Sequence, residues 1–180
     1  NPGPGHTPVS TTATSRGTGA VLALLGSVGT PTMQRAAPVA VETGTIFFGA
    51  FTDAASILRD AQAGICSKYI FNVRASYAQE AHATMELFKK RNVPSYRNLI
   101  SFDQNDSFGQ AGYDGLVAAY KRLYGEFPAS ADPNNPIVRF RYTRNDDASV
   151  PAQAQAAQQY LASLLASQSG TVHVGVMMTD

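Results

Sequence analysis

The residues best suited to chemistry lie where a short apolar run, Val21–Leu25, gives way to small residues and a helix start. The apolar run predicts a buried strand. The small residues Gly26-Ser27-Val28-Gly29 predict a sharp turn that lets a second molecule approach the backbone. Thr30 is a candidate cap for the following helix, with Pro31 at its first position. The unpaired N–H groups and the dipole of a helix start favour a negatively charged group there. The segment therefore predicts an anion-binding turn.

Similar junctions recur along the chain. Two further helix starts have a hydroxyl three residues before a glutamine, which is the pattern of a capping box, at Ser76–Gln79 and Ser107–Gln110. Because the carboxyl ends of parallel strands meet at one sheet edge, we expect four such junctions to converge on one crevice. They are Ser27–Thr30, Ala50–Thr52, Ser76–Tyr77 and Asp106–Phe108. Ordinary helix capping explains each junction taken alone, and that alternative stays open.

The elements that position these junctions alternate between apolar and helical segments. The strand candidates are Val21–Leu25, Thr45–Phe48, Tyr69–Val73, Asn98–Phe102, Ile137–Tyr142 and Val172–Met177. The helix candidates are Pro31–Glu42, Tyr77–Arg91, Phe108–Tyr124 and Val150–Ala166. Alternating strands and helices at this spacing predict an α/β fold, a three-layer parallel sheet with helices on both faces.

The organisation of the chain changes at two places. Residues 1–20 are rich in Gly, Pro, Ser and Thr and predict an irregular lead-in. We expect residues 21–125 to contain most of one α/β lobe, and residues 126–180 a crossover and the start of a second lobe. The turn-rich segment Gly125–Pro136 is either a long surface loop or that crossover. A hydrophobic content of 44% is sufficient to fill a core.

Composition excludes several classes of function. Charged residues make up 15% of the chain, the formal net charge is +1, and the absence of a basic patch with interleaved aromatics argues against nucleic acid as a partner. The sequence contains no 18-residue apolar run that predicts a membrane span and no signal-peptide pattern, so we expect any signal peptide to have been removed. Cys66 is the only cysteine and predicts a small buried thiol without an internal disulfide.

Catalytic, cofactor-binding and metal-binding motifs are not found in the sequence. The three histidines are scattered over the lead-in, a helix and a strand, at His6, His82 and His173. Three aspartates are expected to form turns and face solvent rather than bind a metal, namely Asp103, Asp106 and Asp114. Patterns typical of zinc proteases, P-loops and hydrolase elbows are absent. We therefore expect a protein that is not an enzyme, with no cofactor.

Four blocks, taken in order, resemble the type I periplasmic binding proteins. They are Leu25–Thr32, Phe47–Thr52, Tyr69–Tyr77 and Asp106–Gly112. The branch that they resemble is the leucine/isoleucine/valine-binding group, the substrate-binding components of ABC importers for branched-chain amino acids. In that family two α/β lobes close on a small ligand. The resemblance implies an incomplete two-lobe architecture here, because the family has a strand and helix before Val21 and its second lobe continues beyond Asp180.

The resemblance also implies a binding site in the first lobe. The family holds the carboxylate and ammonium of an amino acid with a serine in one strand-end turn and an alanine and a threonine after the next strand. Those positions fall on Ser27, Ala50 and Thr52 of this sequence. The acidic residue that holds the ammonium in amino-acid binders would lie beyond the end of this chain.

Three aromatic residues are implied to line the rest of the cleft. Phe108 takes the place of the family's tyrosine before a glycine, so the ring is kept and the hydroxyl is lost. Tyr77 occupies a position that lines the ligand's side chain in the family. Together with Phe51, these rings favour an apolar or aromatic ligand over a strictly aliphatic one.

The resemblance implies an extracytoplasmic, periplasmic protein that binds an amino acid or related small carboxylate and delivers it to an ABC transporter permease. The alternative is the ligand-sensing domain of a receptor or histidine kinase with the same fold. A third possibility is a Rossmann-like enzyme that binds phosphate at the turn after Leu25. That enzyme needs an acidic residue at the end of the next strand, where Gly49 and Ala50 stand, and Glu42 falls in the preceding helix.

Overall fold

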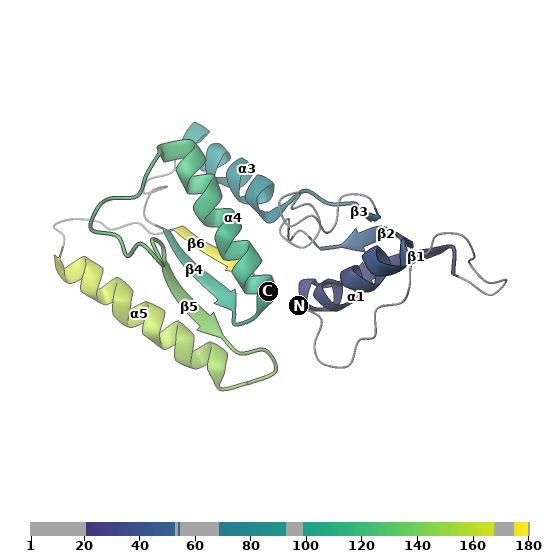
Figure 1. The fold of residues 1–180 in the computed structure, drawn as a ribbon. Coiled ribbons are helices and arrows are strands. Elements are labelled where there is room, and N and C mark those ends of the chain that lie inside the picture. Colours follow the sequence, from purple (N-terminus) through teal and green to yellow (C-terminus); the bar gives the residue numbers. More distant parts are fainter. Residues whose placement is uncertain (1–20, 53, 55–68, 93–98, 168–174, 180) are drawn as a thin grey trace. The chain divides into compact units, whose positions relative to one another are not determined.

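The computed structural model describes residues 21–52, 54, 69–92, 99–167 and 175–179. The chain divides into two compact units, residues 1–74 and 75–180, and each has its own three-stranded parallel sheet (Figure 1). The lead-in, Cys66 and two of the histidines lie outside the described residues. The predicted boundary at residue 125 concerns the lobes of the complete fold and stays a prediction.

The described residues of the first unit form one helix and three strands. They are β1 (Ala23–Val28), α1 (Thr30–Thr43), β2 (Ile46–Phe51) and β3 (Ile70–Asn72). The strands pair in the order β1-β2-β3, all parallel. Parallel neighbours require a crossover, and α1 is the crossover between β1 and β2.

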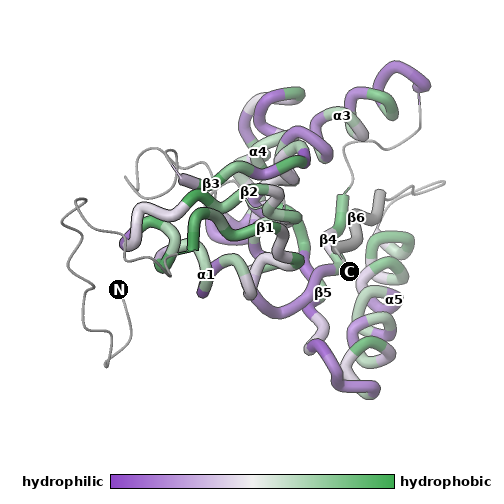
Figure 2. The backbone as a smooth tube through the Cα atoms, turned by 90° about the vertical axis from the view of Figure 1, so that its right-hand side faces the viewer, coloured by the Kyte–Doolittle hydropathy of each residue, from purple (hydrophilic) through white to green (hydrophobic). Residues whose placement is uncertain are grey.

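The core of the first unit lies between α1 and one face of its sheet. The buried residues on α1 and the strands are Met33, Ala37, Ala40, Phe47, Ala50 and Ile70. On the other face, Leu25, Phe48 and Phe71 are paired in register and are 77%, 54% and 46% exposed. Strands β1 and β2 are accordingly hydrophobic over much of their length (Figure 2). The expectation of a buried strand at Val21–Leu25 was therefore wrong, because side chains alternate between faces and only one face meets α1.

Three helices and three strands lie in the part of the second unit that the structure describes. They are α3 (Tyr77–Lys90), β4 (Leu99–Gln104), α4 (Ser107–Tyr124), β5 (Val138–Tyr142), α5 (Ser149–Ser167) and β6 (Gly175–Thr179). The strands pair in the order β5-β4-β6, all parallel. The central strand β4 therefore has a hydrogen-bonded neighbour on each side.

Helices cover both faces of the second sheet (Figure 1). One core cluster joins α3 and α4 to β4 through Met85, Leu99 and Leu116. The other joins α5 to β4 and β5 through Ile100, Phe140 and Ala157. Consecutive residues of β4 thus alternate between two cores, as a central strand requires. This arrangement confirms the predicted three-layer α/β class.

The start of α3 is closed by a capping box, as the sequence predicted. The Ser76 hydroxyl accepts a hydrogen bond from the Gln79 amide at 3.3 Å, and the Gln79 side chain accepts one from the Ser76 amide at 2.8 Å. Ser76 is buried. These two bonds satisfy backbone donors that a helix start otherwise leaves without a partner.

Replacing Ser76 with alanine is expected to lower the free energy of unfolding by about 1 kcal/mol, because the Gln79 amide loses its acceptor. Urea denaturation measures this change. The control is Ser107→Ala, since Ser107 lies inside α4 and is not its cap. Equal losses in the two variants would contradict a specific capping role for Ser76.

Candidate functional site

The carboxyl edge of the first sheet brings three of the predicted site residues together. Ser27 in β1 pairs in register with Ala50 in β2, and Thr52 follows the end of β2. Ala50 and Thr52 are buried, and Ser27 is half-buried. Strand β1 extends through Ser27 to Val28, so the turn predicted at residues 26–29 was wrong. The chain turns at Gly29, where φ is +95°, while Gly26 has a φ of +65° within the strand.

The first turn of α1 differs from the expectation in its cap. Gly29 is the N-cap, and no side chain caps this helix among the described residues. Thr30, the predicted cap, is instead the first helical residue and is buried, with its hydroxyl 2.7 Å from the Thr52 hydroxyl. Because a buried hydroxyl needs a partner, Thr52 holds the Thr30 side chain inside the unit and away from the helix end.

Helix α4 begins with a different cap from the one predicted. Asp106 is the N-cap, and one of its carboxylate oxygens accepts hydrogen bonds from the amides of Phe108 and Gly109 at 2.9 and 3.2 Å. The box predicted at Ser107–Gln110 was wrong, because the helix begins one residue earlier: Asp106 is the cap, and the Gln110 amide that the box would use donates to the backbone oxygen of Asp106 at 3.0 Å.

The three helix starts therefore differ in what they offer an anion. The start of α3 is capped by Ser76 and Gln79. The start of α4 is capped by Asp106, whose negative charge would repel an anion. The start of α1 has no side-chain cap and no acidic residue in its first turn, as far as the described residues show. Among these three helices, α1 is the one whose dipole is best placed to attract a carboxylate.

Arg74, which the sequence analysis did not select, lies over the ring of Phe51, one of the predicted site residues. The Arg74 guanidinium carbon lies 4.8 Å from the centre of the Phe51 ring, which is 46% exposed. Arg74 directly follows the predicted strand Tyr69–Val73 and belongs to one of the four resemblance blocks. Its place at a strand end is a signal that could have identified it. Cation and ring together form a positive, apolar surface.

The two predicted site residues of the second unit lie together. Tyr77, the first residue of α3, packs edge-to-face against Phe108 near the start of α4, with ring centroids 5.7 Å apart. Both side chains are half-buried. The six predicted residues thus fall into a group of four in the first unit and a group of two in the second. Their convergence on one crevice stays a prediction.

Asp103 contradicts the expectation of a solvated turn residue. It lies in β4, its side chain is 0% exposed, and it forms a two-bond ion pair with Arg139, from Nη2 to Oδ1 at 2.6 Å and from Nε to Oδ2 at 3.1 Å. The Ser101 hydroxyl donates to Oδ2 at 2.7 Å, and the Nε of Arg141 lies 3.3 Å from Oδ1. A buried carboxylate requires such partners because desolvating an isolated charge is very costly.

The charge cluster around Asp103 extends to side chains of α4. Arg139 donates from Nη1 to the side-chain oxygen of Gln110 at 3.0 Å and stacks on the Tyr113 ring at 3.9 Å. The Tyr113 hydroxyl donates to the backbone oxygen of Ile137 at 2.8 Å. Burial raises the pKa of Tyr113, so the phenol stays protonated at neutral pH. The sequence signal for this cluster is a polar residue at every second position of two strands. In β4 these residues are Ser101 and Asp103, and in β5 they are Arg139 and Arg141, which pair with them in register.

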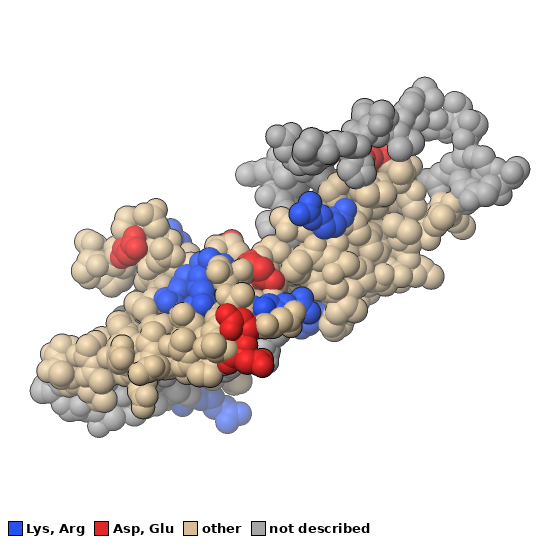
Figure 3. Space-filling view, turned by 90° about the horizontal axis from the view of Figure 1, so that it is seen from below, with Lys and Arg blue, Asp and Glu red and all other residues tan. Residues whose placement is uncertain are grey.

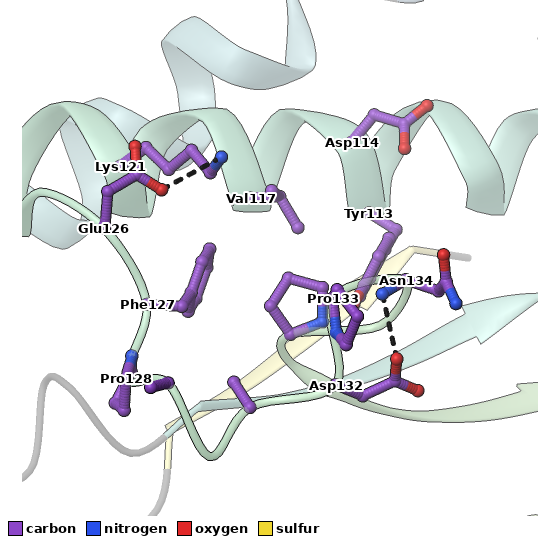
Figure 4. A pocket seen from close by; sticks show the side chains of 13 residues that line it. Tyr113, Asp114, Val117, Lys121, Glu126, Phe127, Pro128, Asp132, Pro133 and Asn134 are labelled. Atoms are coloured by element: carbon purple, nitrogen blue, oxygen red, sulfur yellow. Dashed lines mark hydrogen bonds and ion pairs between the residues drawn. The ribbon is translucent and has the colours of Figure 1, made fainter.

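The second unit also has an open cavity of about 480 Å³ between α4 and the turn-rich loop (Figure 4). Its wall includes Val117, Phe127 and Pro133, and its one lysine, Lys121, is paired with Glu126 at 3.3 Å. The other charged lining residues are acidic. The predicted site residues do not line this cavity, and its charge does not suit a carboxylate.

Neither a metal centre nor a membrane span is found in the described part of the chain. His, Cys, Asp and Glu side chains do not gather there in groups of three that could hold a metal ion. No helix there has the length and hydropathy needed to cross a membrane. On the face shown in Figure 3, charged side chains are few and the two signs are interspersed.

Comparison with known proteins identifies the family. The model of a family described as "periplasmic binding protein" matches residues 10–175. A crystal structure of a possible leucine/isoleucine/valine-binding protein from Rhodopirellula baltica SH 1 is 35% identical, with a TM-score of 0.57 over 74% of this chain and 33% of that one. An ABC transporter substrate-binding protein from Desulfitobacterium hafniense is 12% identical, with a TM-score of 0.44 over 88% of this chain and 46% of that one.

Both solved structures are longer than this chain. This chain spans about a third of the length of the Rhodopirellula protein and less than half of the Desulfitobacterium protein. No match was found among curated proteins. The family model covers most of the chain, and the Rhodopirellula structure shares its parallel α/β architecture. The chain therefore belongs to the type I periplasmic binding proteins, in the branch that includes leucine/isoleucine/valine-binding proteins.

Proposed function

We propose that this protein is an extracytoplasmic solute-binding protein that binds an amino acid or related small carboxylate and delivers it to an ABC importer. The observation that carries the proposal is the start of α1. This helix end has no side-chain cap among the described residues, and it lies beside Ser27 and the buried Thr30–Thr52 pair. Two findings support the ligand class: membership of the periplasmic binding proteins, and the similarity to a possible leucine/isoleucine/valine-binding protein from Rhodopirellula.

The chemistry of this edge suits an anion. A carboxylate there would accept hydrogen bonds from backbone amides and hydroxyls, and charge-assisted bonds are roughly twice as strong as neutral ones. The helix dipole adds about 0.3–1 kcal/mol. Phe51, Tyr77 and Phe108 would contact the apolar part of the ligand, which favours an apolar or aromatic group over a strictly aliphatic one. Binding of this kind requires no nucleophile and no general base.

A thermal-shift screen tests the proposal. The probes are L-leucine, L-phenylalanine and benzoate, and a ligand at 100 times its dissociation constant should add about 2.7 kcal/mol of stability. The double variant Ser27→Ala/Thr52→Val should remove this gain. The absence of a shift with every carboxylate, or a shift that survives in the double variant, would contradict the proposed site.

The matched control is Thr45→Val. Thr45 lies at the opposite end of β2 from Thr52, is also buried, and its hydroxyl likewise bonds another threonine, Thr43, at 2.9 Å. Each substitution removes one threonine–threonine hydrogen bond, but Thr45→Val should cost less stability, because the Thr43 hydroxyl keeps its hydrogen bond to the backbone oxygen of Val39 at 2.7 Å. Only the loss at Thr52 should reduce binding. This comparison separates a contact with the ligand from general destabilisation.

A further inference from the structure

The cavity between α4 and the loop of residues 125–136 has walls that are anchored at both ends of the loop. At one end the Phe127 ring stacks on the Tyr120 ring of α4, with centroids 4.2 Å apart and planes inclined by 11°. At the other end the Tyr113 hydroxyl donates to the backbone oxygen of Ile137 at 2.8 Å and accepts from its amide at 3.2 Å. Three prolines of the loop also line the cavity, and each restricts its own backbone. The cavity is therefore preformed.

The size and the walls of this cavity suit a small organic molecule. Its volume of about 480 Å³ lies within the range of roughly 300–1,000 Å³ that is usual for small-molecule sites. Val117 from α4 and Phe127 and Pro133 from the loop supply apolar surface around the same space (Figure 4). Sites of this kind combine apolar walls with a few polar groups that select the ligand.

The charged groups of the lining favour a positive ligand group. Three carboxylates and one ammonium group line the cavity, which gives the lining a net charge of −2; they belong to Asp114, Glu126, Asp132 and Lys121. The Lys121 ammonium lies 3.3 Å from Glu126, so these two charges largely offset each other. Asp132 accepts a hydrogen bond from the Asn134 amide at 2.9 Å, and a carboxylate has room for further donors. The lining therefore attracts a cation and repels a carboxylate.

An organic cation suits this lining better than a metal ion does. In the described part of the chain, His, Cys, Asp and Glu side chains do not gather in groups of three that could hold a metal. The apolar walls offer no metal ligands, but they can contact the hydrocarbon part of an amine. Arg139 stacks on the Tyr113 ring, yet its charge is balanced by Asp103 and does not cancel that of the lining.

We propose that this cavity is a second binding site, for a small organic cation in which an ammonium group is joined to an apolar body. The body lies against Val117, Phe127 and Pro133, and the ammonium group donates charge-assisted hydrogen bonds to Asp132. Phenethylamine, protonated at neutral pH, is a molecule of this kind. All lining residues belong to the second unit, so the proposal does not rest on the carboxylate site proposed in the first unit.

Backbone NMR titrations with three probes of similar shape test this inference. The probes are phenethylammonium, phenethyl alcohol and 3-phenylpropionate, which are positive, neutral and negative. Phenethylammonium should bind the cavity about five- to tenfold more tightly than the alcohol, because it gains the attraction of more than one exposed carboxylate. It should shift the amide signals of Val117 and Phe127, and 3-phenylpropionate should not. Added salt should weaken the binding of the amine, because the charges of the lining are exposed.

Two variants should change the affinity for phenethylammonium in opposite directions. Asp132→Asn keeps an acceptor for the Asn134 amide but loses the charge, so the affinity should fall about two- to fivefold. Lys121→Gln removes the positive charge from the lining and releases Glu126, so the affinity should rise by about the same factor. The matched control is Asp147→Asn, an exposed carboxylate outside the lining, which should leave the affinity unchanged. A thermal melt of each variant checks that the fold is retained.

Three results would overturn the proposal: equal affinities for the amine and the alcohol, no shifts at Val117 and Phe127, or an amine affinity that neither charge variant changes. The double variant Ser27→Ala/Thr52→Val should bind phenethylammonium as the wild type does. Loss of binding in that variant would mean that the amine occupies the first unit, and the second site would be wrong. Failure of the amine to bind leaves the proposed carboxylate site untouched, because the two sites share no residue.

Discussion

Replacing Asp103 with asparagine is expected to lower the free energy of unfolding by about 3–5 kcal/mol, the usual cost of removing one partner from a buried ion pair. Asp103 is fully buried, and its partner Arg139 is 9% exposed. The variant leaves the Arg139 charge in a site with little access to water. Two charge-assisted hydrogen bonds also become weaker, neutral ones. Urea denaturation followed by circular dichroism measures the loss.

Two comparisons make this prediction specific. Asp132→Asn, at an exposed position, should change stability by less than about 0.5 kcal/mol. The double variant Asp103→Leu/Arg139→Met should be less destabilised than Asp103→Asn, because it leaves no unpaired charge on Arg139. If Asp103→Asn and Asp132→Asn have the same stability, Asp103 does not form the buried pair described above.

Gly109→Ala is the second substitution with a large expected effect. A Cβ atom at this position would overlap the backbone oxygen of Gln104 at the end of β4 and would lie 2.7 Å from its nitrogen. Backbone atoms of a central strand cannot move aside as a flexible side chain does. We expect a loss of about 3 kcal/mol, at the upper end of the cost of overpacking.

The sign of this change is itself informative. Where there is space, Gly→Ala in a helix stabilises a protein by about 0.4–1 kcal/mol. A variant at Gly109 that is as stable as the wild type, or more so, would show that α4 does not approach β4 this closely. Thermal denaturation decides between the two results. Because Phe108 precedes this glycine, ligand affinity should fall together with stability.

The secondary structure of this protein was largely predictable from its sequence, because apolar and helical segments alternate at the spacing of an α/β fold. Capping was predictable only in part. Ser76 caps α3 as expected, but Asp106 takes the place expected for Ser107, since its carboxylate makes charge-assisted bonds to the first free amides of α4. Thr30 was predicted to cap the start of α1 and instead bonds Thr52, a partner 22 residues away.

The charge cluster was not predicted, because burial of a polar residue depends on partners from other strands. Asp103 alone is typical of a turn or a solvated loop. Its burial follows from the pairing of β4 with β5, which places Arg139 and Arg141 beside it. Which strands are neighbours depends on residues far apart in the sequence. The local pattern of apolar and polar residues therefore does not predict it. The same limit applies to the predicted ligand crevice. The sequence assigns its residues to strand ends, but it does not show that the residues of the first unit and those of the second unit converge.

Backbone NMR during a ligand titration tests the central claim most directly. The probes are the tightest-binding carboxylate from the screen and its neutral amide. The carboxylate should shift the amide signals of Thr30 and Thr32, in the first turn of α1, more than those of Phe108 and Gly109, which Asp106 already caps. The neutral amide should have little effect. Larger shifts at the start of α4, or no shifts at α1, would contradict an anion site at the start of α1.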